Sequence, residues 1–383
     1  MRKASQTLQS PDPGNQPGGS PTIREASFGD YQQISELESR YGLGPRSYEE
    51  WSRLWLNNPI YPELQPGWPI GWVLEDANKQ IVASVSNIPL CYEFQGSKIL
   101  AATGRAQVAE PAYRSASLLL VDRLINQRNI DLYLNNTMTA EAAASFGIFE
   151  CPRVPVGAWD ESAFWITRYR GFFESLLAIK KYPLARLLSF PLAAVASFKD
   201  RVAAPRLRDD GVEVTTCAGF DDRFDEFWAS LRSRNTHLLL AVRTREVLEW
   251  HFGHALGNNR LWIAAVVDGP RLAAYAIFDR RDNPRIGLKR VRLVDYQSLD
   301  NSTALLAPLL SWAVRKCRDE GIHTLENTGR WLEPEEFIAR VAPYRRKLST
   351  WTYFYRARNP GLTESLRDRR AWAPSLFDGN ASL

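Results

Sequence analysis

The sequence predicts an α/β (α+β) protein of two tandem domains, each a mixed, mostly antiparallel sheet flanked by helices. Short segments with alternating or continuous apolar residues are typical of strands, and longer segments between them carry apolar residues at helical spacing. The order strand, two helices, three strands, helix, strand, helix occurs in the first half and again in the second half. With 383 residues, the chain is long enough for two domains that each bury a core.

The first domain is expected over residues 21–170. Asp30 can cap its first helix, and Ile34 and Leu37 lie at helical spacing on the inner face of that helix. A turn at 76–79 separates two alternating segments, which predicts a pair of antiparallel strands. The expected elements are a strand at 22–26, helices at 30–41 and 47–56, strands at 71–75, 80–89, 92–94 and 99–108, a helix at 118–128, a strand at 131–136 and a helix at 139–149.

The second domain is expected over residues 210–358, after a strand at 162–168 and a helical connector at 171–209. Residues 1–20 are rich in Pro, Gly, Ser and Gln, which predicts a disordered lead-in, and residues 359–383 form a C-terminal arm. The expected elements of the second domain are a strand at 211–216, helices at 221–234 and 244–254, strands at 260–267, 272–279 and 289–296, a helix at 304–320, a strand at 323–327 and a helix at 334–341.

Composition and charge are those of a globular protein, with 45% hydrophobic and 24% charged residues. The net charge of +5 is mild and its basic residues are spread along the chain, so no nucleic-acid partner is expected. The N-terminal residues lack the apolar region of a secretory signal, so a cytoplasmic location is expected. The four cysteines have no paired spacing, so neither a disulfide framework nor a zinc site is expected: Cys91, Cys151, Cys217 and Cys317.

The segment 182–198 comes nearest to a membrane span. Arg186 and two prolines within it argue against a span. Four basic residues flank it, Lys180, Lys181, Lys199 and Arg201. A buried helical hairpin between the domains is expected here, and the alternative is an interfacial helix that contacts the inner membrane peripherally.

An anion site is expected where a strand at 101–109 leads through a turn of small residues at 110–117 into a helix at 118–128. Such a turn leaves backbone N–H groups free at the N-terminus of the helix, and the helix dipole adds to their attraction for an anion such as a pyrophosphate. Arg114 adds a fixed positive charge at the entry. The alternative is a strand-turn-helix without a ligand.

This segment resembles the acyl-CoA-dependent N-acyltransferases of the GNAT superfamily. In that family the fourth strand is followed by Arg/Gln-x-x-Gly-x-Gly/Ala, which wraps the pyrophosphate of acetyl-CoA. The chain has Arg114-Ser115-Ala116-Ser117-Leu118-Leu119 in that place, so Ser117 and Leu119 replace the family's small residues. The lead-in Val-x-Pro-x-Tyr-Arg is matched, one register step off, by residues 108–114. The element order over about residues 21–160 is also that of the family.

The doubled arrangement is similar to tandem GNAT-like proteins of bacterial polysaccharide-biosynthesis pathways and to the Fem-type peptidoglycan aminoacyltransferases. The second copy lacks the phosphate turn, because Asp295 and Asp300 lie where open backbone donors are needed and no glycine follows. The resemblance therefore implies one acyl-CoA site, in the first domain, with acetyl-CoA or another acyl-CoA as co-substrate and no metal.

The resemblance also implies roles for the residues of the first domain. Residues at the end of the fourth strand would flank the acyl group, namely Gln107, Val108 and Ala109. The turn would hold the pyrophosphate through Tyr113, Arg114, Ser115, Ala116, Ser117 and Leu118. The end of the next strand would line the opposite wall with Asn135, Asn136 and Thr137. Asn136, Thr137 and Glu110 are the expected catalytic side chains, and Glu110 alternatively caps the turn.

An acceptor amine is expected near Thr103 and Arg105, which share one side of the strand with Gln107. The alternative for this polar side is a solvated face. Asn135 would contact the acceptor from the first domain, and Asp295 and Glu326 would contact it from the second.

One departure from the family concerns the acid that protonates the leaving thiolate. Many GNAT enzymes have a tyrosine on the helix after the fifth strand, and Phe146 stands at that position here. Thr137 and Cys151 are nearby substitutes. His251 and His254 are spaced for a metal on one helix, but no further ligand lies close in sequence, so no metal is expected.

The sequence therefore predicts an acyl-CoA-dependent N-acyltransferase that acts on an amine, with an amino sugar of a surface-polysaccharide precursor as the expected acceptor. Two alternatives stay open. One is Fem-type aminoacyl transfer from charged tRNA, and the other is a catalytically degenerate pair of domains that serves as a binding or scaffold module.

Overall fold

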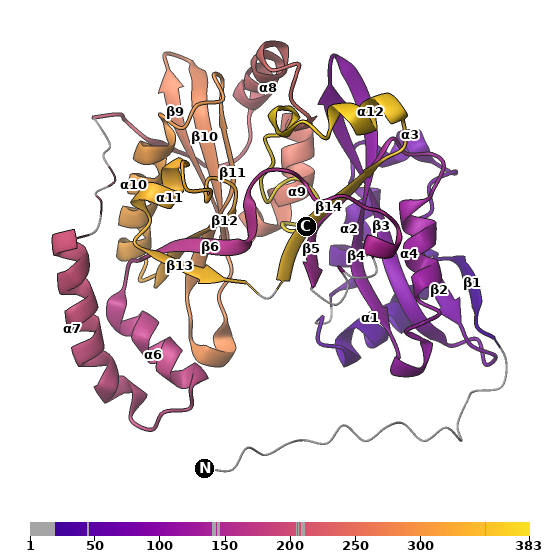
Figure 1. Ribbon diagram of the computed structural model, residues 1–383, viewed down its shortest axis with the longest axis horizontal. Coiled ribbons are helices and arrows are strands. Elements are labelled where there is room, and N and C mark those ends of the chain that lie inside the picture. The colour runs from indigo at the N-terminus through magenta and orange to yellow at the C-terminus, as the bar shows by residue number, and fades with distance from the viewer. Residues whose placement is uncertain are drawn as a thin grey trace. The chain divides into compact units, whose positions relative to one another are not determined.

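The computed structural model describes residues 20–43, 46–139, 143, 146–203, 205, 207, 211–348 and 350–383. Within this part of the chain, the strands form two seven-stranded mixed sheets with helices packed against them (Figure 1). By its internal contacts the chain divides into two compact units. One comprises residues up to 51 with 69–87 and 105–127, and the other comprises residues 52–68, 88–104 and 128–383.

The first sheet has the strand order β1-β2-β3-β4-β5-β14, and β8 pairs with β3 outside this path. The pairs β1–β2, β2–β3 and β5–β14 are antiparallel, whereas β4 and β5 run parallel. The strands are β1 (Thr22–Glu25), β2 (Gly71–Glu75), β3 (Ile81–Phe94), β4 (Ser97–Ala109), β5 (Leu132–Thr139), β8 (Leu240–Ala241) and β14 (Thr350–Ala357).

The second sheet has the order β13-β6-β12-β11-β10-β9-β7. Its one parallel pair among the described strands is β11–β12, which is the counterpart of β4–β5. The strands are β6 (Ala158–Ile166), β7 (Thr215–Cys217), β9 (Leu261–Asp268), β10 (Arg271–Arg280), β11 (Arg290–Ser298), β12 (Thr324–Gly329) and β13 (Tyr344–Lys347).

Each half of the chain supplies strands to the other half's sheet. β6 follows the first-half strands in sequence but lies between β13 and β12. β14 follows the second-half strands but pairs with β5, with Tyr355 opposite Leu134. The first half thus supplies β6 to the second sheet, and the second half supplies β14 and the short strand β8 to the first.

Side-chain caps mark the start of some of the helices. Asp221 and Thr244 cap α8 and α9 by accepting from backbone N–H groups in the first turn. The helices are α1 (Tyr31–Arg40), α2 (Tyr48–Leu56), α3 (Tyr61–Leu64), α4 (Leu118–Ile125), α6 (Tyr169–Ile179), α7 (Ala185–Ala203), α8 (Asp222–Arg234), α9 (Arg245–Gly257), α10 (Leu306–Asp319), α11 (Phe337–Val341) and α12 (Pro360–Ser365).

One large core cluster lies between α10 and the second sheet. Leu306, Leu309, Leu310 and Ala313 on one face of α10 are fully buried. They pack against apolar side chains of β9, β10, β11 and β12. The apolar side chains that alternate along these strands thus pack against the apolar face of α10.

Three expectations about the elements need correction. The strands β13 and β14 are missing from the sequence prediction, which assigns nothing between 341 and the terminal arm. Thr139 belongs to β5 rather than to a helix, and 140–142 and 144–145 lie outside the described residues. Asp295 and the residues up to Ser298 extend β11 instead of forming a turn.

The buried hairpin expected at 182–198 is also wrong. Most of this segment belongs to α7, which follows α6, and its side chains Leu187, Val195 and Phe198 are 67%, 70% and 71% exposed. None of the helices in the described ranges combines the length and the apolar character that crossing a membrane requires.

Candidate active site

The strands β4 and β5 separate after a short parallel pairing. Ala101–Thr103 pairs with Leu132–Leu134, and no described residue of β5 pairs with β4 beyond this point. Ala106 has a φ of 52°, a left-handed conformation that a non-glycine residue adopts at a cost of about 1–2 kcal/mol. An irregular residue of this kind bends a strand away from its neighbour. The strand therefore continues to Ala109 without β5 beside it.

The turn between β4 and α4 leaves backbone donors free. The N–H groups of Tyr113 and Ser117 donate to Glu110 O and Tyr113 O, at 2.9 Å each. For Arg114, Ser115 and Ala116, the described residues supply no acceptor for the backbone N–H. Arg114 and Ser115 are exposed, so these donors reach solvent. This is the arrangement that binds anions at a helix N-terminus.

The side chain of Ser117 does not block these donors. It is buried, and its hydroxyl donates to Arg114 O at 2.7 Å. Tyr113 is also buried, whereas Leu118 is half-buried at the start of α4. The buried side chains of Ser117 and Tyr113 thus lie on the inner side of the turn, and the backbone N–H groups of Arg114–Ala116 stay available to a ligand.

Of the other residues expected beside it, Gln107 is exposed, Val108 is buried, and Arg105 and Ala109 are half-buried. Glu110 accepts an ion pair from Arg40 of α1 at 2.7 Å, and its side chain makes no cap hydrogen bond to the turn. Glu110 is therefore paired with Arg40. This contact differs from both predicted roles, a free catalytic base and a cap of the turn.

The end of β5 contacts the C-terminal segment, residues 372–383, which is buried along its whole length. Asn136 is fully buried, its amide donates to Asp378 O, and its Oδ1 accepts from the N–H groups of Asn380 and Ala381 at 3.0 and 2.9 Å. The Asn380 amide donates to Gly104 O and to Thr137 Oγ1, at 2.8 Å each. The segment thus links Gly104 of β4 to the end of β5.

These contacts change the roles expected for two residues. The Asn136 amide bonds to the backbone of Asp378, Asn380 and Ala381, so it holds the C-terminal segment in place rather than standing free as a catalytic side chain. Asn135 is buried and donates to Gly104 O at 3.2 Å. Thr137 is half-buried, and its hydroxyl proton has no assigned acceptor among the described residues. Thr103 is fully buried, and its hydroxyl has no partner in the same residues.

A buried charge network holds the same segment to the second sheet. Arg243 donates to both carboxylate oxygens of Asp295, at 2.8 and 3.1 Å, and approaches Asp378 at 3.4 Å. The three side chains are at most 5% exposed. Although burial opposes it, the Arg243 charge lowers the pKa of Asp295, whereas burial raises the pKa of Asp378. The Arg243 cation therefore favours the charged form of Asp295, whereas burial dominates at Asp378.

Asp295 and Glu326 consequently do not face an acceptor. Asp295 is fully buried on Arg243, and Glu326 is 4% exposed and accepts from Arg346 at 2.9 Å. Each carboxylate is paired with an arginine, as a buried carboxylate requires. The sequence shows two acids near strand ends but not the arginines that neutralise them.

Phe146 and Cys151 are core side chains. The Phe146 ring stacks between Tyr133 and Phe354, with centroids 5.9 and 5.7 Å away. Burial raises the pKa of the Cys151 thiol to about 11, so this thiol is protonated at neutral pH. Neither side chain supplies an acid with a pKa near 7.

The residues that sequence analysis misses are Arg243, Asp378 and Asn380. The signal available in the sequence is the mixture of Trp372, Leu376 and Phe377 with polar residues in a segment that otherwise looks like a tail. Such a mixture indicates burial with hydrogen-bonded polar groups, although it does not indicate the partners.

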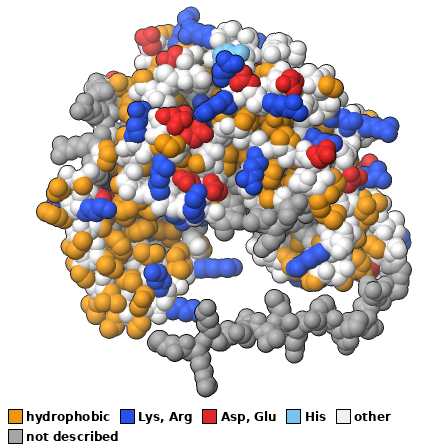
Figure 2. Space-filling view, in the orientation of Figure 1, with side chains coloured by type: hydrophobic (Ala, Val, Ile, Leu, Met, Phe, Trp, Pro, Cys, Tyr) orange, Lys and Arg blue, Asp and Glu red, His pale blue; other side chains and the backbone are white. Residues whose placement is uncertain are grey.

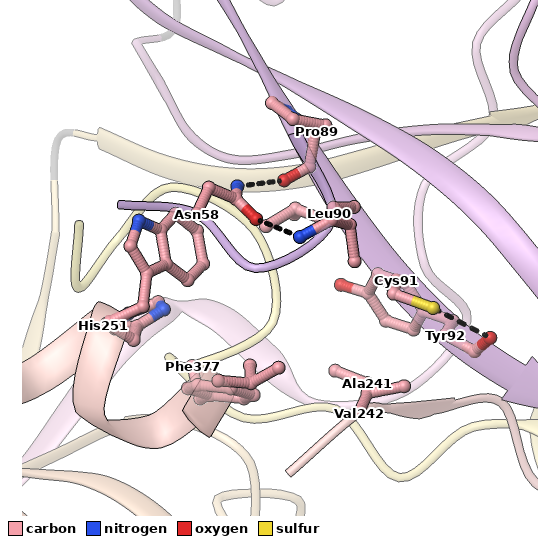
Figure 3. A pocket seen from close by; sticks show the side chains of 12 residues that line it. Asn58, Pro89, Leu90, Cys91, Tyr92, Ala241, Val242, His251 and Phe377 are labelled. Carbon is pink, nitrogen blue, oxygen red and sulfur yellow. Dashed lines mark hydrogen bonds between the residues drawn. The ribbon is translucent and has the colours of Figure 1, made fainter. Parts of the chain in front are cut away.

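A cavity of about 20 Å³ lies near this segment, among Asn58, Cys91, His251 and Phe377 (Figure 3). It has room for about one water molecule and is too small for a substrate. His251 is held by Ser382, with Nε2 and Oγ 2.7 Å apart, and burial lowers its pKa well below 6.5. No three His, Cys, Asp or Glu side chains in the described ranges gather as a metal site would require.

Comparison with known proteins gives structural but not sequence matches. Neither a protein-family model nor a curated protein sequence matches the chain. The fold is similar to a GCN5-related N-acetyltransferase from Anabaena variabilis, with a TM-score of 0.53, 12% identity, and coverage of 89% of this chain and 73% of that one. It is similar to a probable N-acyltransferase from Enterococcus faecalis, with a TM-score of 0.54, 11% identity, and coverage of 88% and 73%.

A third similar structure is the N-myristoyltransferase of Saccharomyces cerevisiae with bound myristoyl-CoA and inhibitors. Its TM-score is 0.54 at 12% identity, with 90% of this chain and 85% of that chain covered. Similarity at such low identity shows the fold alone. It confirms the predicted fold class, two mixed sheets flanked by helices in the manner of GNAT proteins.

Proposed function

We propose that this protein is an acyl-CoA-dependent N-acyltransferase. The observation that supports it best is the run of backbone N–H groups at Arg114–Ala116 for which the described residues supply no acceptor, after a strand whose parallel pairing ends at Thr103. The Arg114 guanidinium is exposed beside them. A diphosphate matches these donors in charge and in hydrogen-bonding capacity.

In the reaction, the amine nitrogen attacks the thioester carbonyl, the C–N bond forms and the C–S bond breaks. The amine loses a proton and the leaving thiolate gains one. Thr137 is the remaining candidate to donate a hydrogen bond to the reacting groups, because the Asn136 amide and Glu110 are engaged elsewhere. Much of the rate enhancement would come from positioning. The acceptor is an amine, and an amino sugar of a surface-polysaccharide precursor stays a prediction.

The first experiment is a calorimetric titration of the full chain with acetyl-CoA and with longer acyl-CoAs. Arg114→Glu should weaken binding by roughly 10- to 150-fold, because a hydrogen bond to a charged group is worth about 1.5–3 kcal/mol. Arg123→Glu is the matched control, because Arg123 is exposed on α4 in the last turn. Equal affinity of both variants, or no saturable binding by the wild type, would contradict the proposal.

Two further variants refine the site. Ser117→Gly should preserve or tighten binding, because glycine allows closer approach of the backbone. Thr137→Val should leave acyl-CoA affinity unchanged and lower the rate of thiol release with an amine acceptor. A marked loss of affinity in Ser117→Gly would show that the ligand lies elsewhere.

A second candidate function is a catalytically inactive acyl-CoA-binding module. It is favoured by Phe146 in the core and by the bond between Asn380 and the candidate hydroxyl of Thr137. Saturable acyl-CoA binding without thiol release, across several amine acceptors, would favour this candidate.

A further inference from the structure

The α6–α7 hairpin carries large apolar side chains on its outside. Of the sixteen exposed large hydrophobic side chains in the described residues, ten lie between Ile179 and Val202. Figure 2 shows hydrophobic side chains gathered over this hairpin, at the lower left of the view. A contiguous apolar patch of this kind is unusual on a monomeric protein and indicates an interaction surface.

The arrangement of α7 is the reverse of an ordinary surface helix. Its outward stripe contains Leu187, Val195, Phe198 and Val202, which are 67–73% exposed. At about 100° per residue, the opposite face holds the small or polar residues Ala185, Ser189, Ala193, Ala196, Ser197 and Asp200. Ser189 is fully buried, and small side chains allow α7 to pack closely on α6. Folding therefore leaves the apolar stripe uncovered, whereas amphipathic helices usually bury it.

Positive charge borders this stripe. A groove of about 760 Å³ beside the hairpin is lined by Arg168, Arg170, Arg201 and Arg318, among others. Arg201 and Arg318 have no acidic side chain within 4.0 Å in the described ranges. The nearby carboxylate of Asp200 accepts instead from the hydroxyls of Tyr169 and Tyr344, at 2.7 and 2.9 Å.

The turn between the helices adds further cations. Lys180 and Lys181 are exposed there, and Lys199 is exposed on α7 beside the stripe. The hairpin thus combines an uncovered apolar surface with a cationic rim, as interfacial helices on anionic membranes do.

We propose that the α6–α7 hairpin docks this protein onto the surface of a bilayer that contains anionic lipid. The outward stripe of α7 would enter the boundary between headgroups and acyl chains, and the arginine groove would bind phosphate headgroups. α7 lies on the membrane rather than across it, because Arg186, Lys199, Asp200 and Arg201 interrupt its apolar character. A second copy of the chain fits less well, because a two-fold contact would bring two cationic rims together.

The test uses the full chain and vesicle flotation, with phosphatidylcholine alone and with added phosphatidylglycerol. The wild type should float with the anionic vesicles, and high salt should weaken the binding. Val195→Glu with Phe198→Glu should reduce binding at least about tenfold. The matched control is Leu56→Glu, at another exposed apolar position (51% exposed), and should bind as the wild type does.

A second variant tests the groove. Arg201→Gln with Arg318→Gln should weaken binding to anionic vesicles by about fivefold for each cation removed, with no change on neutral vesicles. Both pairs of substitutions lie at surface positions, and circular dichroism checks that the variants fold.

The proposal is overturned if the wild type floats with neither the neutral nor the anionic vesicles and stays in the fraction that holds free protein. It is also overturned if the apolar variant floats as the wild type does. A wild-type dimer that Val195→Glu with Phe198→Glu makes monomeric, without vesicle binding, would show that the stripe is an interface between copies.

Discussion

Replacing Arg243 by methionine tests the buried charge network. The variant removes the cation that contacts Asp295 at 2.8 Å and Asp378 at 3.4 Å while it keeps most of the apolar volume. Asp295 would then have to take up a proton or stay charged without a partner. Raising the pKa of a carboxyl from about 3.9 to about 7 costs about 4 kcal/mol, at 1.36 kcal/mol per pKa unit. This agrees with the 3–5 kcal/mol typical for a buried ion pair that loses one partner.

The loss is measured as the difference in unfolding free energy from urea titrations followed by circular dichroism. Arg243→Met with Asp295→Asn should recover most of the stability, because neither charge is then left alone. The control is Arg367→Ala, which removes a pair with Glu364 whose side chains are 69% and 74% exposed. It should cost less than about 1 kcal/mol. A loss in Arg243→Met as small as in the control, or no recovery in the double variant, would refute this account of the network.

Three further predictions concern stability. Folding raises the pKa of Asp378, so the native state holds this proton more tightly and the unfolding free energy should fall as pH rises above about 4. Urea titrations at several pH values should show a weaker fall in Asp378→Asn. An unchanged pH dependence in this variant would contradict the raised pKa of Asp378. Gly329 has a φ of 81° and an added Cβ would come within 2.2 Å of the Trp159 ring, so Gly329→Ala should lose about 2–4 kcal/mol in the same assay. A loss of unfolding free energy under about 1 kcal/mol in Gly329→Ala would show that the Trp159 ring can move aside without cost. Phe146→Ala should lose about 3–5 kcal/mol by removing the ring stacked between Tyr133 and Phe354, and near-wild-type stability would exclude a core role.

Elements with local signals were predictable from the sequence. β2 is found at the predicted residues 71–75, and α8 (Asp222–Arg234) matches the helix predicted at 221–234. Both depend on patterns that a few neighbouring residues create, namely alternation in a strand and a capping carboxylate before an amphipathic run. The element order, and with it the fold class, follows from such signals.

The missed features depend on contacts between distant parts of the chain. β14 pairs with β5 across more than 200 residues, and Asn136 binds the backbone around Asn380, which is 244 residues away in sequence. Composition alone cannot separate a buried segment from a free tail when the covering residues come from elsewhere. For α7 the sequence shows the apolar residues, but not that the helix packs on α6 through its small residues.

The turn at Arg114–Ala116 shows how far the residues of the candidate site could be predicted. The small residues and Arg114 indicate open donors, and the described backbone has them. The roles predicted for Asp295 and Glu326 differ from their contacts because Arg243 and Arg346, which neutralise them, are distant in sequence.

The exchange of β6 and β14 has a consequence for synthesis on the ribosome. The free edge of β5 cannot be covered until residues 350–357 have been translated, near the end of the chain. Until then its backbone groups are open to pairing with another nascent chain. A chain cut between the two halves would leave each fragment short of a strand, so the fragments should be insoluble when expressed apart and should recover when expressed together.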